Sequence, residues 1–327
     1  MAEGPVGNDE RTGVPRPTAV VAIGGNALAR AGEAGRFEEQ MANALPMARA
    51  LAGLDAAGYR LAVVHGNGPQ VGSLAIQQEE GARLVPPQPL FALGAMTQGQ
   101  LGSLLELALW QVGADLQGRV VPVVTHVVVD PADAAFASPS KPIGPYFPPE
   151  RARRLAAEKG WTVQHLPPGG WRRVVVSPDP LEIVEAEAIG LLVSAGYLVL
   201  AAGGGGVPVV REGQGLSGVE AVIDKDLAAE RLATSLGAVA LVLVTDVDQV
   251  SLGFGTPEER PVAEMTAEEA EAHLAEGQFR SGSMGPKVSA AVRFLRHGGE
   301  VAVITSAAKV TAALEGRHGT RLLAKGG

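Results

Sequence analysis

The chain has 327 residues, 46% of them hydrophobic, which is enough apolar material for one large domain or two smaller ones and excludes a disordered protein. Its formal net charge of −8 disfavours a nucleic-acid-binding surface, because such surfaces are basic. The chain has no cysteine, which excludes disulfide bonds, thiolate metal sites and a cysteine nucleophile and is common in cytoplasmic proteins.

The N-terminal segment, residues 1–17, reads MAEGPVGNDERTGVPRP. It is polar and rich in glycine and proline, and it lacks the apolar core of a secretory signal. We therefore predict a disordered tail here, with the folded part of the chain spanning residues 18–327.

Short apolar runs rich in β-branched residues alternate with amphipathic segments along the rest of the chain. The runs are continuously apolar, which is typical of strands covered on both faces, so we predict an α/β fold with a mainly parallel sheet between helices. The predicted strands are 18–23, 60–64, 119–129, 197–202, 238–245 and 300–305. The predicted helices include 38–57, 93–112 and one that starts with a capping box at Thr266 and Glu269.

One uncharged stretch, residues 188–210, has the length of a membrane span. Its glycines 203–206 and Pro208 would open a helix in the middle of the bilayer, where nothing satisfies the backbone. We interpret it as the end of a helix, a turn at Gly196, a buried strand and a glycine loop, and we predict no membrane contact.

A proline-rich stretch interrupts the alternation at residues 130–170 and contains SPSKPIGPYFPPE. It is too long and too stiff for an ordinary connection between elements. We predict an inserted subdomain over the edge of the sheet, closed by a strand at 172–177.

Four glycine-rich loops flank the predicted strands and helices: IGGNA (23–27), HGNGPQVG (65–72), AGGGGVP (202–208) and GSMGPK (282–287). Ligands of open parallel sheets bind where the carboxyl ends of the strands meet, so these loops should converge. Glycines let backbone N–H groups approach an anion, although a tight turn also needs glycine. The spacing fits neither the P-loop nor the dinucleotide motif, which disfavours NAD.

The chain contains only six lysines among its 27 basic residues, and three of them stand in rigid contexts: Lys141, Lys225 and Lys287. A lysine is a compact charge suited to phosphate oxygens, whereas arginine fits planar partners. Phosphoryl transfer needs such charge around the transferred group. A lysine taken alone is usually better explained as a solvated surface charge. The scarcity of lysine and the glycine context reverse this preference for Lys225 and Lys287, whereas Lys141 could stand on an exposed proline loop.

Asp224 is a predicted N-cap, which puts Lys225 and Asp226 in the first turn of a helix. Neighbours along a helix do not face each other, so we expect Asp226 to be more than an ion-pair partner of Lys225. It would orient lysines across the site or bind through Mg²⁺-bound water; the alternative is a helix-dipole partner.

Asp246 and Asp248 end a predicted strand. They fit either a metal site or a capped turn, and because Mg²⁺ usually reaches such sites on the nucleotide, we assign them no metal-binding role.

The histidines show no metal or triad spacing, and His65 is interpreted as structural. GLSG (215–218) lacks the spacing of a nucleophile elbow.

Ten motifs in chain order resemble the carbamate kinase family of the amino-acid kinase superfamily, from about residue 18 to residue 323. They are AVVAIGGNAL, VVHGNGPQVG, AMTQGQLG, VVTHVVVD, DAAFASPSKPIGPY, RRVVVSPDP, AAGGGGVPVV, VEAVIDKDLAAERLA, VLVTDVDQV and GSMGPKVSAAVRFL. The elements SKPIGP, AVIDKDLA and GSMGPK separate this family from acetylglutamate, glutamate, aspartate and uridylate kinases.

The resemblance implies an open three-layer αβα sandwich, with an amino-acid kinase domain at 18–327 from which a lid subdomain at 130–170 protrudes. It also implies a cytoplasmic homodimer that exchanges a phosphoryl group reversibly between ATP plus carbamate and ADP plus carbamoyl phosphate. Mg²⁺ would be carried with the nucleotide.

The same resemblance assigns roles to residues. Lys225 and Lys287 would neutralise charge in the transition state, Asp226 would organise them, and Lys141 would close onto the phosphoryl group. Lys141 would replace a first-strand lysine of relatives, where this chain has Ile23. The residues holding carbamate and the phosphoryl group would be Gly24, Gly25, Asn26, Gly66, Asn67 and Gly68. Those around the nucleotide would be Gly204, Gly205, Asp246, Val247, Met284 and Pro286.

Two residues depart from the family pattern: Ser103 stands where an aromatic residue is expected and His126 where glutamine is frequent. Both bear on substrate affinity more than on the reaction.

The sequence also allows two other functions. One is a related kinase with a larger acceptor; the other is a non-catalytic sensor of nucleotide or carbamoyl phosphate, since a fold can be reused without its activity.

Overall fold

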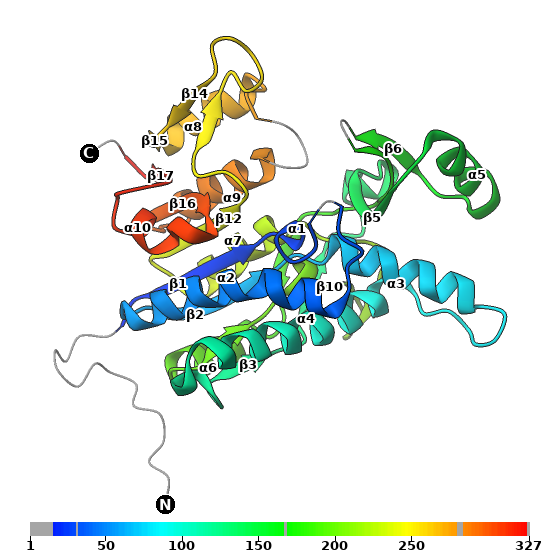
Figure 1. The fold of residues 1–327 in the computed structure, drawn as a ribbon, viewed down its shortest axis with the longest axis horizontal. Helices are drawn as coiled ribbons and strands as arrows, with labels where there is room; N and C mark the ends of the chain where they lie inside the picture. Colours follow the sequence, from blue (N-terminus) through cyan, green and yellow to red (C-terminus); the bar gives the residue numbers. More distant parts are fainter. Residues whose placement is uncertain (1–15, 31, 167–168, 280–283, 326–327) are drawn as a thin grey trace, which may run out of the picture.

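The computed structural model describes residues 16–30, 32–166, 169–279 and 284–325 (Figure 1). The predicted tail lies outside the described residues except for Arg16 and Pro17. Arg16 donates to the Asp55 carboxylate at 3.0 Å and to the backbone carbonyl oxygens of Asp55, Gly58 and Tyr59. These bonds tie the start of the described chain to the segment before the second strand.

An eight-stranded sheet forms the centre of the molecule. Its order is β15 (Glu264–Thr266), β17 (Thr320–Leu323), β16 (Val301–Ser306), β12 (Ala240–Thr245), β1 (Thr18–Ile23), β2 (Arg60–His65), β9 (Leu198–Leu200) and β3 (Val120–Pro122). All neighbouring pairs in it are parallel except β16 with β17. The predicted mainly parallel sheet is therefore confirmed.

Helices cover both faces of this sheet and make the three layers. One face carries α6 (Ala186–Ser194), α7 (Lys225–Ser235), α8 (Ala267–Ala275) and α9 (Met284–Arg296). The other face carries α1 (Gly25–Leu28), α2 (Phe37–Ala56), α4 (Leu90–Val112) and α10 (Val310–Leu314).

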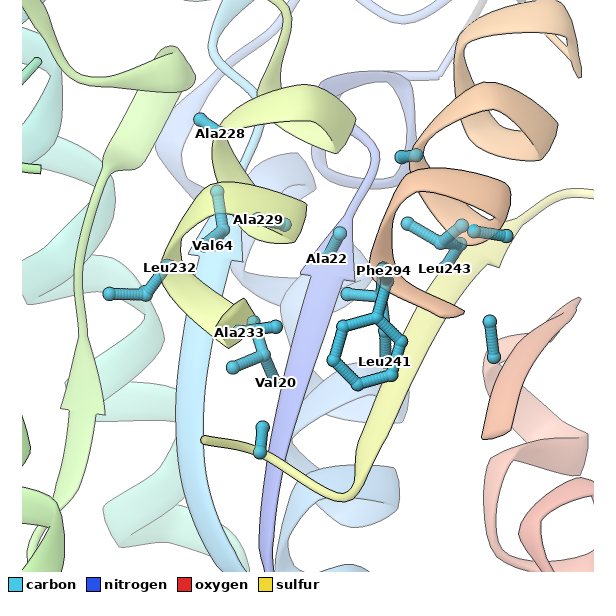
Figure 2. Close-up of a cluster of buried hydrophobic side chains, with 14 of the residues drawn as sticks. Val20, Ala22, Val64, Ala228, Ala229, Leu232, Ala233, Leu241, Leu243 and Phe294 are labelled. Atoms are coloured by element: carbon cyan, nitrogen blue, oxygen red, sulfur yellow. The ribbon is translucent and has the colours of Figure 1, made fainter. Parts of the chain in front are cut away.

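The central strand β1 explains why both faces need cover. Its side chains alternate: Val20 and Ala22 pack under α7 and α9, whereas Val21 and Ile23 join the core on the opposite face. Figure 2 shows the first of these cores, with Leu232 of α7 and Phe294 of α9 over the strands. Apolar contact on both faces fixes the register of the strands at the centre of the sheet.

Smaller sheets surround this body. A four-stranded sheet has the order β11 (Gly215–Gly218), β10 (Val207–Glu212), β4 (His126–Val129) and β8 (Pro180–Ile183). A hairpin pairs β13 (Val250–Leu252) with β14 (Arg260–Val262). Short 3₁₀ helices are η1 (Ala114–Leu116), η2 (Ala134–Ala137), η3 (Gly203–Gly205) and η4 (Ala307–Lys309).

The predicted single strand at 119–129 is wrong, because the chain divides it into β3 and β4, which belong to different sheets. Between them, the side-chain amide of Gln98 accepts from Thr125 N at 2.8 Å and donates to Thr125 O at 3.1 Å. Val123 N still donates to Leu200 O at 2.8 Å, so the central ladder passes Pro122 and ends before Thr125. Thr125 bonds to Gln98 through both backbone groups, and its carbonyl oxygen also accepts from Val207 N of β10 at 2.8 Å, where the second sheet begins.

The stretch 188–210 has the predicted form. Helix α6 ends at Ser194, Gly196 turns with a φ of +90°, and β9 leads into the glycine loop of η3. Among the described residues, no helix is long and apolar enough to cross a membrane.

A three-stranded antiparallel sheet, β5 (Lys141–Phe147), β7 (Gly170–Val175) and β6 (Val163–Leu166), joins helix α5 (Pro149–Lys159) in a unit that projects beside α3 (Gly68–Gly81) in Figure 1. The strand predicted to close the insertion is β7, its central strand. We call residues 141–175 the projecting unit.

Candidate active site

The carboxyl ends of the parallel strands bring the glycine loops together. Ile23 of β1 is in register with His65 of β2, and Val63 of β2 with Leu200 of β9, so the loops that follow these strands meet at one edge. The predicted convergence of these loops is confirmed. Residues 280–283, which begin the fourth glycine loop, lie outside the described residues.

Close backbone contact explains the glycines in the first two loops. A Cβ placed on Gly66 would lie 2.5 Å from Gly25 N, closer than a Cβ can approach backbone, and a tight 3.0 Å from Lys225 Cδ. A Cβ on Gly25 would lie 3.0 Å from the carbonyl carbon of Gly66. The two loops and the stem of Lys225 therefore share one small volume.

Gly66 itself is not a free donor, because its N–H donates to Ile23 O at 2.8 Å. Asn67 caps α3 and Gly68 begins it, with Pro69 next. The first N–H groups of a helix have no intrahelical partner, so Asn67 and Gly68 are the donors that this loop can offer an anion. Asn26 lies in α1, and its side chain falls outside the described residues.

The third loop, after β9, packs against the second. Gly204 and Gly205 are buried and adopt φ angles of +69° and +94°. A Cβ on Gly204 would lie 2.1 Å from Asn67 Nδ2, which in turn donates to Thr97 Oγ1 at 2.8 Å. The glycines here provide both the left-handed backbone and the close approach.

The three lysines meet in one network of ion pairs with two aspartates. Lys225 Nζ lies 2.6 Å from Asp226 Oδ1, and Lys287 Nζ lies 2.9 Å from Asp226 Oδ2. Lys141 Nζ lies 2.5 Å from Asp224 Oδ2, whose other oxygen accepts from Asp226 N at 2.8 Å. The side chain of Asp226 is only 5% exposed, so this is a charged cluster largely withdrawn from water.

Three elements supply the lysines. Lys225 begins α7 after the Asp224 N-cap, as predicted. Lys287 stands in the first turn of α9, behind Met284 and Pro286, and Lys141 begins β5 in the projecting unit. The cluster therefore joins the two helices under one face of the sheet to the projecting unit.

Burial and charge act against each other in this cluster. Burial raises the pKa of Asp226, but the ammonium groups of Lys225 and Lys287 outweigh it and hold the pKa below the ordinary value. Asp224 behaves likewise: burial is outweighed by Lys141 and Lys225, and its pKa is lowered. Burial lowers the pKa of Lys225 to about 8, with Lys287 adding to the effect and Asp226 opposing it. Lys287, also buried, has a raised pKa because Asp226 outweighs the burial.

Asp226 is more than an ion-pair partner of Lys225, as expected, although the premise for that expectation does not hold here. The rule that helix neighbours do not face each other concerns Cβ directions, and it does not limit a four-carbon side chain at the first position of the helix. Lys225 reaches Asp226 directly, and Lys287 reaches it from another helix, so Asp226 does contact both lysines.

Asp224 caps α7 as predicted, but its contact with Lys141 is not predicted from the sequence. The two residues are 83 positions apart, and the doubled acid in "DKD" was the one signal in the sequence for a second carboxylate at this place.

The strand-end residues of the predicted nucleotide set lie at the same edge but outside the network. Asp246 and Val247 are exposed after β12, and Asp246 accepts from Thr245 Oγ1. Asp248 accepts from Ser306 Oγ at 2.5 Å. Among the described residues, no group of three or more acidic or histidine side chains has the geometry of a metal site.

Of the two departures from the family pattern, His126 contacts a carboxylate outside the lysine network. His126 Nδ1 contacts Glu185 Oε1 at 2.8 Å, and the same carboxylate accepts from His126 N. Ser103 is exposed on α4.

The described part of the chain has two hollows, of about 360 and 130 Å³. Their linings include Thr18 and Gly237, so they lie at the amino end of the sheet, opposite the network.

Comparisons with known proteins show which family the chain is similar to. A model of the family described as "Amino acid kinase family" matches residues 17–306. The chain is 47% identical to a carbamate kinase of Pyrococcus furiosus over 93% of this chain and 98% of that one, and 45% identical to one of Halobacterium salinarum over 93% and 97%.

Solved structures give the same result. Carbamate kinase from Giardia lamblia bound to citric acid is 39% identical, with a TM-score of 0.89 over 94% of this chain and 98% of that chain. The same enzyme bound to AMP-PNP is 38% identical, with a TM-score of 0.83 over the same shares.

Proposed function

This chain belongs to the amino acid kinase family, and from that premise we propose that it is a carbamate kinase, which transfers a phosphoryl group reversibly between ATP plus carbamate and ADP plus carbamoyl phosphate. The observation that carries the assignment is the cluster in which Lys225 and Lys287 share the carboxylate of Asp226 at the mouth of the glycine loops. Full-length similarity to carbamate kinases supports it.

The reaction needs charge and position more than covalent participation. Towards ATP, a terminal β-phosphate oxygen of ADP attacks the phosphorus of carbamoyl phosphate, and the bond from phosphorus to the carbamoyl oxygen breaks, which leaves carbamate. Negative charge is spread over the three oxygens of the migrating group and over the two oxygens in line with it. Lys225 and Lys287 would neutralise this charge from fixed positions.

Asp226 would set those positions. One carboxylate bonded to two ammonium groups holds both in a geometry that neither lysine would keep alone, since each has a flexible stem. A buried charge fixed before the substrate arrives needs no reorganisation during the reaction, which is the main advantage of such a site.

The glycine loops would hold the small substrate. Backbone N–H groups of Gly24 and Gly25 after β1, and of Asn67 and Gly68 at the start of α3, would bind oxygens of the carbamoyl and phosphoryl groups, together with Asn26. Gly66 would donate no hydrogen bond of its own, since its N–H is already bonded. Its lack of a side chain would leave room for these groups and for the Lys225 stem. Carbamate is small, which suits a pocket lined by loops.

Lys141 would supply a third charge from the projecting unit. Its ammonium group is paired with Asp224, one residue before Lys225 in sequence. When the substrate is present, the ammonium group would move from Asp224 to contact the phosphoryl group. Gly204, Gly205, Asp246, Val247, Met284 and Pro286 would surround the nucleotide, an assignment taken from the family resemblance.

Mg²⁺ would arrive with the nucleotide as part of that substrate. The carboxylates of Asp224 and Asp226 are engaged by lysines, and the described residues offer no three-ligand cluster, which fits a metal held mainly by phosphate oxygens. When bound, it would neutralise charge on the β- and γ-phosphates. The homodimer and the cytoplasmic location stay predictions.

A coupled assay of ATP formation from ADP and carbamoyl phosphate tests the function, with Lys287→Ala as the comparison. Turnover in the native chain that Lys287→Ala abolishes is the expected result. Absence of turnover with retained nucleotide binding would favour a sensor. Phosphorylation of N-acetylglutamate, glutamate, aspartate or UMP in place of carbamate would favour a related kinase with a larger acceptor.

A further inference from the structure

Helix α3 contacts the projecting unit along its whole length. At its start, a Cβ placed on Gly68 would lie 3.5 Å from Pro142 O. At its end, Glu79 Oε1 accepts from Trp161 Nε1 at 3.2 Å and lies 3.5 Å from Arg173 Nη1. The unit is thus held by the helix that carries the Asn67–Gly68 donors.

Apolar packing makes this contact continuous. Val71 and Ala75 of α3 form a buried cluster with Ile143 of β5 and Val175 of β7. Ile76 packs on a second cluster around Phe147. The position of β5 therefore depends on α3 at several points.

The closest approach is at Gly72. A Cβ placed there would lie 2.0 Å from Gly144 N and 2.1 Å from Gly144 Cα, so the two backbones touch and position 72 has no room for a methyl group. The obstruction is main chain, which cannot turn away as the end of a flexible side chain can.

This contact lies close to Lys141 in the same strand. Gly144 is three residues after Lys141 in β5, which at about 3.3 Å per residue is about 10 Å along the strand. Any shift of β5 away from α3 would reach Lys141, whose ammonium is held 2.5 Å from Asp224 Oδ2. The position of Lys141 relative to the network is sensitive to how closely α3 and β5 pack.

We propose that Gly72 is a positioning residue for Lys141: by allowing backbone contact between α3 and β5, it sets where the third ammonium group lies. The proposal rests on the transfer role proposed for Lys141. Gly72 has no side chain to touch a substrate, so its effect reaches the chemistry only through the strand.

The test compares Gly72→Ala with Gly81→Ala on the same helix, where a Cβ would meet nothing within 4 Å. Displacement of a reacting group by about 1 Å can cost about 100-fold in rate, so we expect kcat for Gly72→Ala to fall at least about tenfold. Gly81→Ala should keep native kcat. The Kd for ADP, measured by calorimetry, should change less than about twofold in both, and circular dichroism should report a folded protein in both.

A double-mutant cycle with Lys141→Ala separates positioning from general damage. If Gly72 acts through Lys141, adding Gly72→Ala to Lys141→Ala should lower kcat by less than about twofold more. Losses that multiply, or native kcat in Gly72→Ala, would overturn the proposal. Native kcat in Lys141→Ala alone would instead defeat the role proposed for Lys141.

A second variant serves if Gly72→Ala does not fold. Glu79→Ala cuts the contacts of α3 with Trp161 and Arg173 at the far end of the unit and introduces no clash. A fall in kcat that disappears in the Lys141→Ala background is then expected, and an unchanged kcat would reject positioning by α3.

Discussion

Lys287 and Asp226 are 61 positions apart in the sequence, and Lys287 Nζ lies 2.9 Å from Asp226 Oδ2. Because Lys225 occupies the other oxygen of the same carboxylate, the spacing of two ammonium groups is set by the width of one carboxyl group. Removal of one partner from such a buried set leaves an uncompensated charge, which is strongly destabilising. The arrangement is therefore both a source of positive charge and a rigid support for it.

The shape of these cations is the first testable property. Lys225→Arg and Lys287→Arg should lower kcat nearly as far as the alanine variants, by about 100- to 1,000-fold, because a wide planar guanidinium cannot occupy the place of an ammonium against Asp226. At position 225 the stem already passes Gly66 closely. The measurement is initial rates of ATP formation from ADP and carbamoyl phosphate.

Lys325→Arg is the matched control, since Lys325 is exposed, and it should behave as the native chain. Near-native kcat in either buried arginine variant would mean that charge alone suffices at that position.

The pH dependence of the free enzyme is the second property. Burial lowers the pKa of Lys225 to about 8, so its charge is present below that pH and is lost as the pH rises. We expect kcat/KM for carbamoyl phosphate to fall as the pH rises through about 8, since this ratio reports groups of the free enzyme. Asp226 raises this pKa, so in Asp226→Asn the normalised fall should begin at lower pH. Constant kcat/KM between pH 7 and pH 10 would disagree with a titrating Lys225.

The sequence predicted where the loops meet but not which charges pair. Convergence follows from strand direction alone, because parallel strands end at the same edge. Pairing needs the distance between helices that follow different strands, which spacing along the chain does not contain. Lys141 meets Asp224 across 83 positions, and the backbone N–H of Thr125, between β3 and β4, donates to the side chain of Gln98, 27 residues earlier. A pattern of hydrophobic residues along the chain contains no information about such contacts between residues that are distant in the sequence.

The lack of space for a side chain in the third glycine loop is the third testable property, and a matched pair of variants tests it. Gly205 and Gly213 both have positive φ, +94° and +59°, but a Cβ on Gly205 would lie 2.3 Å from Ile223 O, whereas one on Gly213 would meet nothing within 4 Å. Gly213→Ala should cost about 1 kcal/mol in the free energy of unfolding, from backbone strain alone. Gly205→Ala should cost several times more, as for other forced contacts in a core.

Ile223 immediately precedes the Asp224 cap of α7, so Gly205→Ala should also lower kcat by displacing Lys225, while Gly213→Ala should not. Urea unfolding and the ATP-formation assay measure the two effects. Equal stability of the two variants would show that the loop relaxes around the added methyl group.

The last prediction concerns His65, which is 2% exposed at the end of β2, with Nδ1 lying 3.3 Å from Gly66 O. Burial lowers the pKa of His65 from 6.5 to about 4, although the contact with Gly66 opposes this. The unfolded chain takes up a proton here as the pH falls through about 6.5, whereas the folded chain does so only near 4. The neutral ring thus stabilises the fold above about pH 6.5, and this stability is lost as the pH falls towards 4.

The loss at pH 4 corresponds to about 3 kcal/mol in the free energy of unfolding. Urea unfolding between pH 7 and pH 4 should give a steeper decline for the native chain than for His65→Gln, which carries no titrating group there. His165→Gln, at an exposed position of the projecting unit, should keep the native slope. Parallel declines for the native chain and His65→Gln would mean that the folded protein accepts the proton at His65 as readily as the unfolded chain does.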